Sequence, residues 1–202
     1  MSKAPFAPDL SLWEPWHPAE AARRLAGLGV PWCVAGGWAL DLHHGRQTRE
    51  HDDLEIAIPR ASFESVRRAL HDLELFAIGD GLAHPLSAET LAAHHQTWAR
   101  EPESGLWRID VMREPWSRSE WVFRRDPRVR RSIAEAVELT SDGIPYLQPE
   151  IVLLFKAKSS APKDEEDFAR ILPLLDLTRR RWLADALRLV HPGHPWLRAF
   201  EN

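Results

Sequence analysis

The sequence of 202 residues contains one cysteine, Cys33, and no long hydrophobic run. Because a single thiol has no second thiol to pair with, a disulfide framework and a zinc site built from several cysteines are both excluded. No uncharged apolar run approaches the roughly 20 residues that a membrane-spanning helix needs, and MSKAPFAPDL has no apolar signal segment. We therefore expect a cytoplasmic protein without a membrane partner.

Excess positive charge is also missing. The chain has 26 Lys and Arg against 30 Asp and Glu, which gives a formal net charge of −4 and a pI near 6.2. It therefore lacks the global basic field that supplies sequence-independent affinity for nucleic acid. A polynucleotide partner is disfavoured, and the 44% hydrophobic content suits one sizeable soluble domain or two small ones.

Lysine is rare among the basic residues, and three of the four lysines, Lys156, Lys158 and Lys163, fall within eight positions. In a chain that otherwise uses arginine, these compact point charges favour phosphate binding. The alternative is a solvated helix end, where the helix dipole favours cations. We rank Lys156 first because it follows the apolar run Ile151 to Phe155, which holds its backbone in place.

Hydrophobic periodicity predicts an α+β fold. Strands are expected at residues 31–35, 53–58, 73–78, 107–112, 121–123 and 144–147. Helices are expected at residues 18–28, 38–43, 60–71, 89–94, 150–158, 164–175 (capped by Asp164) and 178–190. Residues 1–18 are expected to form an irregular arm anchored by Trp13 and Trp16. The change in pattern predicts an α+β domain over residues 1–147 and a helical C-terminal subdomain over residues 148–202.

Three carboxylates fall on predicted strands. Asp53 and Glu55 alternate with Leu54 and Ile56, so both acids point to one face, about 6–7 Å apart along the backbone. Asp110 takes the same kind of position on a later strand. Oxygen ligands of this type suit Mg²⁺, which is commonly held by one or two carboxylates together with substrate phosphates. The alternative is that these acids only make a solvent-facing strand soluble.

A glycine pair precedes these acids. Gly36-Gly37 ends one predicted strand and opens a helix, where backbone N–H groups and the helix dipole favour a phosphate. The loop that follows carries Arg46, Arg49 and His51, which can steer a polyphosphate. Taken singly, each feature is equally well explained as a turn or a solvated loop, and the hypothesis depends on their order along the chain.

The stretch GGWALDLHHGRQTREHDDLEI, residues 36–56, resembles the signature of the polymerase-beta-type nucleotidyltransferase superfamily, in particular its lincosamide and aminoglycoside nucleotidyltransferase branch. The resemblance implies a mixed sheet flanked by helices and followed by a small helical part. It also implies that Gly36 and Gly37 cradle a nucleoside triphosphate. We expect Arg49, Lys156 and Lys158 to bind the same nucleotide through their positive charge. The resemblance further implies that Asp53 and Glu55 bind Mg²⁺ and that Asp110 completes the catalytic and metal site.

Glu55 is a departure from the antibiotic-modifying members, which usually have aspartate there. Its extra methylene shifts a bound metal by about 1 Å, and a misplacement of that size can cost of order 100-fold in rate. This departure bears on antibiotic modification more than on nucleotide binding.

The leading hypothesis is a Mg²⁺-dependent enzyme that moves a nucleoside monophosphate, AMP from ATP, to a hydroxyl of a small molecule such as an aminoglycoside or lincosamide. Two alternatives stay open. One is a toxin-like nucleotidyltransferase that modifies tRNA or protein, and the other is a non-catalytic nucleotide-binding module. The resemblance also leaves a homodimer open, since relatives can build sites at subunit interfaces.

Overall fold

The computed structural model describes residues 4–159 and 161–201 and contains one large mixed sheet with helices packed on it. The sheet has eight strands in the order β4-β3-β5-β6-β2-β1-β10-β9. Their bounds are Cys33–Val34 (β1), Glu55–Pro59 (β2), Glu74–Gly79 (β3), Leu82–Pro85 (β4), Gln96–Arg100 (β5), Trp107–Glu114 (β6), Val137–Leu139 (β9) and Pro145–Leu147 (β10). A separate hairpin pairs β7 (Glu120–Val122) with β8 (Arg130–Ser132).

The pairing at the centre of the sheet sets the position of the carboxylates. Strand β2 runs antiparallel to β1 and parallel to β6, and its register places Glu55 directly beside Asp110. Leu54, Ile56 and Ile58 are fully buried, as the alternation predicts. Because successive side chains on a strand point to opposite faces, the burial of these aliphatic residues turns Glu55 to the other face.

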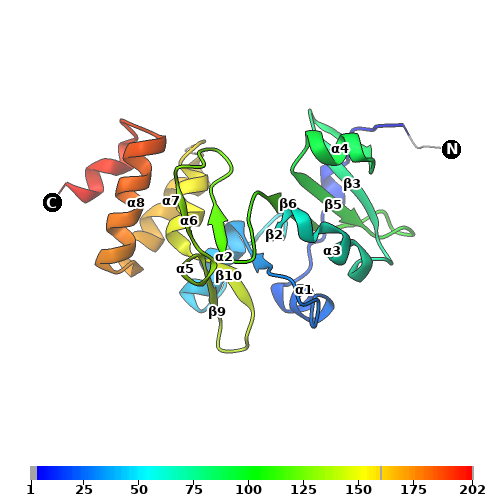
Figure 1. The fold of residues 1–202 in the computed structure, drawn as a ribbon, viewed down its shortest axis with the longest axis horizontal. Coiled ribbons are helices and arrows are strands. Elements are labelled where there is room, and N and C mark those ends of the chain that lie inside the picture. The colour runs from blue at the N-terminus through cyan, green and yellow to red at the C-terminus, as the bar shows by residue number, and fades with distance from the viewer. Residues whose placement is uncertain (1–3, 160, 202) are drawn as a thin grey trace.

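The helices follow in chain order: Pro18–Arg24 (α1), Gly36–His44 (α2), Phe63–Ala69 (α3), Ala88–Ala93 (α4), Ile133–Ala136 (α5), Pro149–Lys156 (α6), Pro162–Ile171 (α7) and Leu177–Val190 (α8). Figure 1 shows α6, α7 and α8 at one end of the molecule and β3, β5 and α4 at the other. None of the helices within residues 4–159 and 161–201 has the length and apolar character needed to cross a bilayer.

Local sequence explains where several helices begin and end. Helix α2 stops because Gly45 adopts a left-handed conformation with φ of +82°, which its missing Cβ allows at no steric cost. Pro149 occupies the first turn of α6, where its missing N–H leaves no bond unmade. The side chain of Asp176 accepts a hydrogen bond from the backbone of Arg179 and caps α8.

Several predicted boundaries were wrong. Helix α1 ends at Arg24 instead of reaching Leu28. Helix α7 begins at Pro162 with Ala161 as its N-cap, and it ends at Ile171 before a 3₁₀ turn. Asp164 therefore does not cap it, because the side chain of Asp164 accepts hydrogen bonds from Lys156 and Ser159 instead.

Strands β4 and β5 lie in the region where the sequence showed little pattern. On β5 the fully buried positions are Thr97 and Ala99, which are polar or small, so hydrophobic alternation is weak there.

The N-terminal arm joins the sheet through isolated bridges of Phe6 to Ala83 and of Trp13 to Trp107. The larger of two hydrophobic clusters in the described residues includes residues of both predicted parts, such as Leu40 and Leu183. The predicted division at residue 147 falls between β10 and α6 and stays a prediction.

Candidate active site

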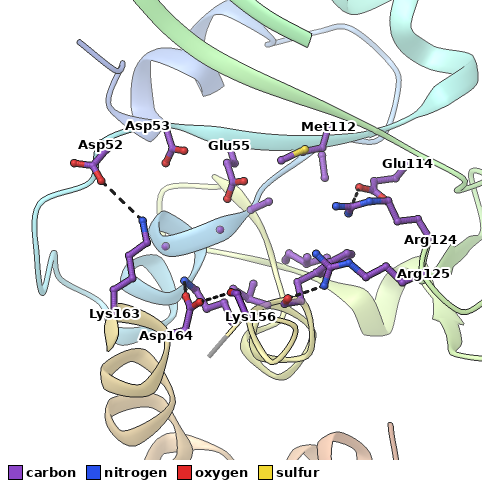
Figure 2. A pocket seen from close by; sticks show the side chains of 18 of the residues that line it. Asp52, Asp53, Glu55, Met112, Glu114, Arg124, Arg125, Lys156, Lys163 and Asp164 are labelled. Carbon is purple, nitrogen blue, oxygen red and sulfur yellow. Dashed lines mark hydrogen bonds and ion pairs between the residues drawn. The ribbon is translucent and has the colours of Figure 1, made fainter. Parts of the chain in front are cut away.

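A cavity of about 260 Å³ lies between the sheet and the helices α2, α6 and α7. Figure 2 shows the acidic residues Asp52, Asp53 and Glu55 along one side of it, and Lys156, Lys163 and Asp164 along the other. Gly36, Gly37 and Arg49 also line it. The structure thus brings together most of the residues that the sequence singled out, although they come from segments more than 100 residues apart.

Asp53 and Glu55 lie on the sheet side of the cavity, here called the sheet wall, and neither forms an ion pair with a described residue. No Lys, Arg or His nitrogen among the described residues lies within 4.0 Å of a carboxylate oxygen of Asp53, Glu55 or Asp110. Burial and the neighbouring Asp53 raise the pKa of Glu55 to about 7, and burial followed by Asp52 raises the pKa of Asp53. Lys163 lowers the pKa of Asp53 and Lys156 lowers that of Glu55, but these more distant cations do not outweigh burial and the repulsion between carboxylates.

Asp110 lies behind this wall and does not line the cavity. It is 2% exposed, and burial followed by repulsion from Glu55 raises its pKa well above the ordinary value. Its Oδ2 accepts a hydrogen bond of 2.8 Å from Gln96 Nε2, whereas its Oδ1 is buried without a partner. Among the described residues, no three His, Cys, Asp or Glu side chains are grouped closely enough to hold a metal ion by themselves. The role of Asp110 as a third ligand stays a prediction.

The two glycines make room for neighbouring functional side chains. Gly36 has φ of +57°, and a Cβ on it would overlap the Glu55 carboxylate at Oε2. A Cβ on Gly37 would lie 2.6 Å from His51 Nδ1 and would also press on Arg49. Any larger residue at position 36 would therefore displace Glu55 from the N-terminus of α2.

The loop between α2 and β2 is fixed by a buried acid. Asp41, 3% exposed, accepts hydrogen bonds from the backbone and hydroxyl of Thr48, and its Oδ2 lies 2.6 Å from His51 Nε2. The His51 ring also packs on Trp38 with 4.6 Å between centroids. Burial lowers the pKa of His51 despite its partner Asp41. Of the predicted steering residues, His51 is therefore part of the scaffold and Arg46 is exposed.

The side of the cavity formed by α6 and α7, here called the helix wall, carries acids and bases that form ion pairs with one another. Lys156 Nζ lies 2.8 Å from Asp164 Oδ1 and 3.0 Å from Asp167 Oδ2. Asp167 also binds Arg49 at 3.3 Å and Arg170 at 3.0 Å. Although burial opposes the shift, Lys156 and Arg49 lower the pKa of Asp167. The network holds the Lys156 ammonium and the Arg49 guanidinium at the cavity.

The other two lysines differ from Lys156. Lys163 lines the cavity and lies 3.9 Å from the exposed Asp52. Lys158 is exposed and is not among the lining residues. The structure therefore does not bring Lys158 to the phosphate-binding position that the clustering of lysines predicts.

Sequence reasoning missed one end of the cavity, which is lined by Met112, Glu114, Trp116, Arg124 and Arg125. Glu114 Oε1 accepts a hydrogen bond of 2.9 Å from Arg124 Nη1. Burial raises the pKa of Glu114. The available signal was the extension of the alternation on β6 from Asp110 through Met112 to Glu114, since side chains two residues apart share a face.

Comparisons with known proteins agree with this geometry. The model of the aminoglycoside-2''-adenylyltransferase family matches residues 19–82. Curated 2''-aminoglycoside nucleotidyltransferases of Escherichia coli and Klebsiella pneumoniae are each 31% identical over 75 residues, which cover 36% of this chain and 42% of each relative. The chain thus spans less than half the length of these relatives. The residues that the family model matches include Gly36, Gly37, Asp53 and Glu55.

Two solved structures share the fold over most of the chain. The solution structure of the antibiotic-resistance factor ANT(2'')-Ia has a TM-score of 0.57 and 14% identity and covers 89% of this chain and 91% of its own. The crystal structure of the lincosamide antibiotic adenylyltransferase LnuA, bound to lincomycin, has a TM-score of 0.54 and 16% identity and covers 78% and 95%. At these identities the likeness concerns the fold. Family model, relatives and fold together make the chain similar to the nucleotidyltransferases of the branch that contains the aminoglycoside and lincosamide adenylyltransferases.

Proposed function

We propose that the protein is a Mg²⁺-dependent nucleotidyltransferase that moves AMP from ATP to a hydroxyl group of a small molecule. The observation that carries this proposal is the uncompensated pair Asp53 and Glu55, which lines a cavity together with Gly36 and Gly37 at the N-terminus of α2. Asp53 and Glu55 are neighbouring carboxylates without an ion pair, and such a pair favours a bound cation. A helix N-terminus suits the phosphates that such a cation would accompany.

The residues present fit Mg²⁺. Asp53 and Glu55 supply hard oxygen ligands, and Mg²⁺ usually completes its shell with water and substrate phosphate instead of an all-protein cage. This is consistent with the absence of a three-residue metal cluster among the described residues. When bound, Mg²⁺ would neutralise the triphosphate and polarise the reacting phosphoryl group.

The chain's own groups would divide the remaining work. The backbone N–H groups of Gly36 and Gly37 would hold phosphate oxygens, and Lys156 and Arg49 would add positive charge opposite the carboxylates. Lys158 is exposed outside the cavity, so it would affect the nucleotide only through long-range electrostatics. The helical residues 148–202 would serve as the subdomain that supplies this cationic wall.

The transfer forms one bond and breaks one. The acceptor hydroxyl oxygen bonds to the α-phosphorus, the bond from this phosphorus to the bridging oxygen breaks, and pyrophosphate leaves with the electron pair. The hydroxyl proton would pass to a carboxylate, and Asp110 is the base that the resemblance suggests. Because Asp110 does not line the cavity, this role would need a rearrangement that brings it to the acceptor. Positioning and electrostatic stabilisation would supply most of the catalysis.

The similar proteins suggest which acceptor to test first. The curated relatives are named 2''-aminoglycoside nucleotidyltransferases, and one fold neighbour is a lincosamide adenylyltransferase. These names make an aminoglycoside or a lincosamide the first acceptor to test. The whole-chain activity is a proposal because the matched segment covers 42% of the curated relatives.

The test is calorimetric binding of a non-hydrolysable ATP analogue to the wild type and to Asp53→Asn, with and without Mg²⁺. We expect Mg²⁺-dependent binding to the wild type and its loss in a folded Asp53→Asn variant. No binding of this or any other triphosphate to the folded wild type would contradict the proposal and favour a non-catalytic module.

A further inference from the structure

The carboxylates around the cavity leave little for a polycationic acceptor to bind. Asp53 and Glu55 are assigned to the metal, and Asp164 is held by Lys156 and Ser159. Glu114 is 2% exposed, with one oxygen bound to Arg124 and the other shielded from solvent. Among the described carboxylates that line the cavity, Asp52 and Asp53 are exposed, and Asp52 lies 3.9 Å from Lys163.

The opposite end of the cavity carries surplus positive charge. No carboxylate of the described residues lies within 4.0 Å of the Arg125 guanidinium, whereas the neighbouring Arg124 is paired with Glu114. Figure 2 shows Arg124 and Arg125 together at the end away from Asp52 and Asp53. The Arg pair thus contributes a net positive charge after its one ion pair is counted.

Arg125 is fixed in place although it is exposed at the rim. Its Nη1 donates a hydrogen bond of 2.7 Å to the backbone oxygen of Phe155, and its guanidinium carbon lies 5.2 Å from the centroid of the Phe155 ring and 5.9 Å from that of Phe123. A guanidinium held in this way loses less conformational entropy when it binds a ligand. Its planar fork suits carboxylate and phosphate groups.

The same end of the cavity has apolar walls. Met112, Trp116 and Phe155 line it beside the two arginines. A ligand that fits here has an apolar or planar body and an anionic group. Because Mg²⁺ and the helix N-terminus would place the triphosphate at the Asp53 end, the arginine end is left for the other substrate.

We propose that the acceptor is a hydroxyl-bearing organic anion, a carboxylate or a phosphate ester with an apolar body, whose anionic group binds Arg125. The inference rests on the proposed nucleotidyl transfer to a small-molecule hydroxyl, and it disfavours the aminoglycoside that the relatives' names suggest. It sets this chain apart from a protein that selects polycationic sugars, since such a ligand would meet Arg125 at one end of the cavity and Lys163 at the other.

The test uses four probes that share a phenol and differ in charge: 4-hydroxybenzoate, 4-hydroxyphenyl phosphate, the neutral 4-hydroxybenzamide and the cationic 4-hydroxybenzylamine. Binding is measured by ligand-observed NMR on the wild type, first alone and then saturated with the Mg²⁺-bound ATP analogue. We expect both anions to bind about tenfold more tightly than the amide, as for one charge-assisted hydrogen bond, and the amine to bind most weakly. The tighter anion identifies the preferred group.

Three variants make the test specific. Arg125→Gln should lose the preference for anions, and Arg125→Lys should keep part of it because the charge remains. Arg128→Gln is the matched control, since Arg128 lies on the same hairpin, pairs with Asp126 and does not line the cavity. Thermal unfolding of each variant shows that it is folded.

Three results would overturn the inference. The first is an amine that binds as tightly as the anions, and the second is an order that is unchanged in Arg125→Gln. The third is an anion preference that disappears when the ATP analogue is bound, because the arginines would then belong to the triphosphate. Failure of the analogue itself to bind is a separate result that overturns the proposed function and the inference with it.

Discussion

On the sheet wall of the cavity Asp53 and Glu55 have no cation within 4.0 Å among the described residues, whereas on the helix wall Asp164 and Asp167 both bind Lys156. All four residues are carboxylic acids, but only Asp164 and Asp167 form ion pairs. Burial and repulsion raise the pKa values of Asp53 and Glu55, while Lys156 and Arg49 outweigh burial and lower that of Asp167.

The difference separates binding groups from groups that hold the structure. Uncompensated buried charge is costly, so a folded chain that keeps it points to a ligand that supplies the missing charge. Compensated charge needs no ligand, and it fixes the side chains that it joins. Substitutions on the sheet wall should therefore act on catalysis, and substitutions in the Asp167 network should act first on stability.

The largest effect is expected on the sheet wall. Asp53→Asn should reduce the rate of pyrophosphate release by about 1000-fold, because it removes a charged ligand from the group that stabilises the transition state. The neighbouring Asp52→Asn is the matched comparison, with a side chain that is 91% exposed, and it should cost far less. Equal losses in the two variants would show that the carboxylates act only through the general charge of the cavity.

The next effect tests the position of Glu55. Gly36→Ala should reduce turnover by about 100-fold, because a Cβ there overlaps the Glu55 carboxylate and shifts it. Gly45→Ala has the same kind of backbone strain, with φ of +82°, but nothing lies within 4 Å of its Cβ. Both variants should lose about 1–2 kcal/mol of stability. Activity lost equally in both would contradict a specific role for Gly36.

A smaller effect is expected from the lysines. Lys156→Met should raise the KM for ATP by about tenfold, which corresponds to one charge-assisted hydrogen bond. Lys158→Met should leave the KM unchanged, since Lys158 is exposed and outside the cavity. Steady-state kinetics at varied ATP concentration measures both KM values. A larger increase in Lys158→Met than in Lys156→Met would show that Lys158 is the lysine that binds phosphate.

The smallest effect on turnover belongs to Asp167. Asp167→Asn should cost about 2 kcal/mol of unfolding free energy at pH 7, because Arg49 and Arg170 lose the carboxylate that they share and Lys156 keeps only Asp164. The pKa of Asp167 is lowered from 3.8, so the stability it contributes is present above that value and is lost as the pH falls through the lowered pKa. Denaturant unfolding of the two proteins should therefore converge at acid pH. A difference independent of pH would show that packing, not charge, is responsible.

The sequence predicted the sheet wall better than the helix wall. Alternation around Leu54 and Ile56 located Asp53 and Glu55, since a period of two fixes which residues share a face. The pairing of Lys156 with Asp164 and Asp167 was missed, because it depends on how α7 packs against α6 and not on any local pattern. The start of α7 was missed for a related reason, since the Asp164 side chain has a tertiary partner that competes with capping.

By itself the sequence determined which residues alternate, where glycine breaks a helix, and that acids follow a glycine pair in an order typical of nucleotidyltransferases. Those are properties of neighbouring residues, and the physical rules behind them are local. Only the tertiary structure decided that Asp110 is buried behind the cavity, that His51 belongs to the scaffold, and that Arg124 and Arg125 close one end. Burial and charge pairing depend on segments brought together over more than 100 residues, and no local pattern records them.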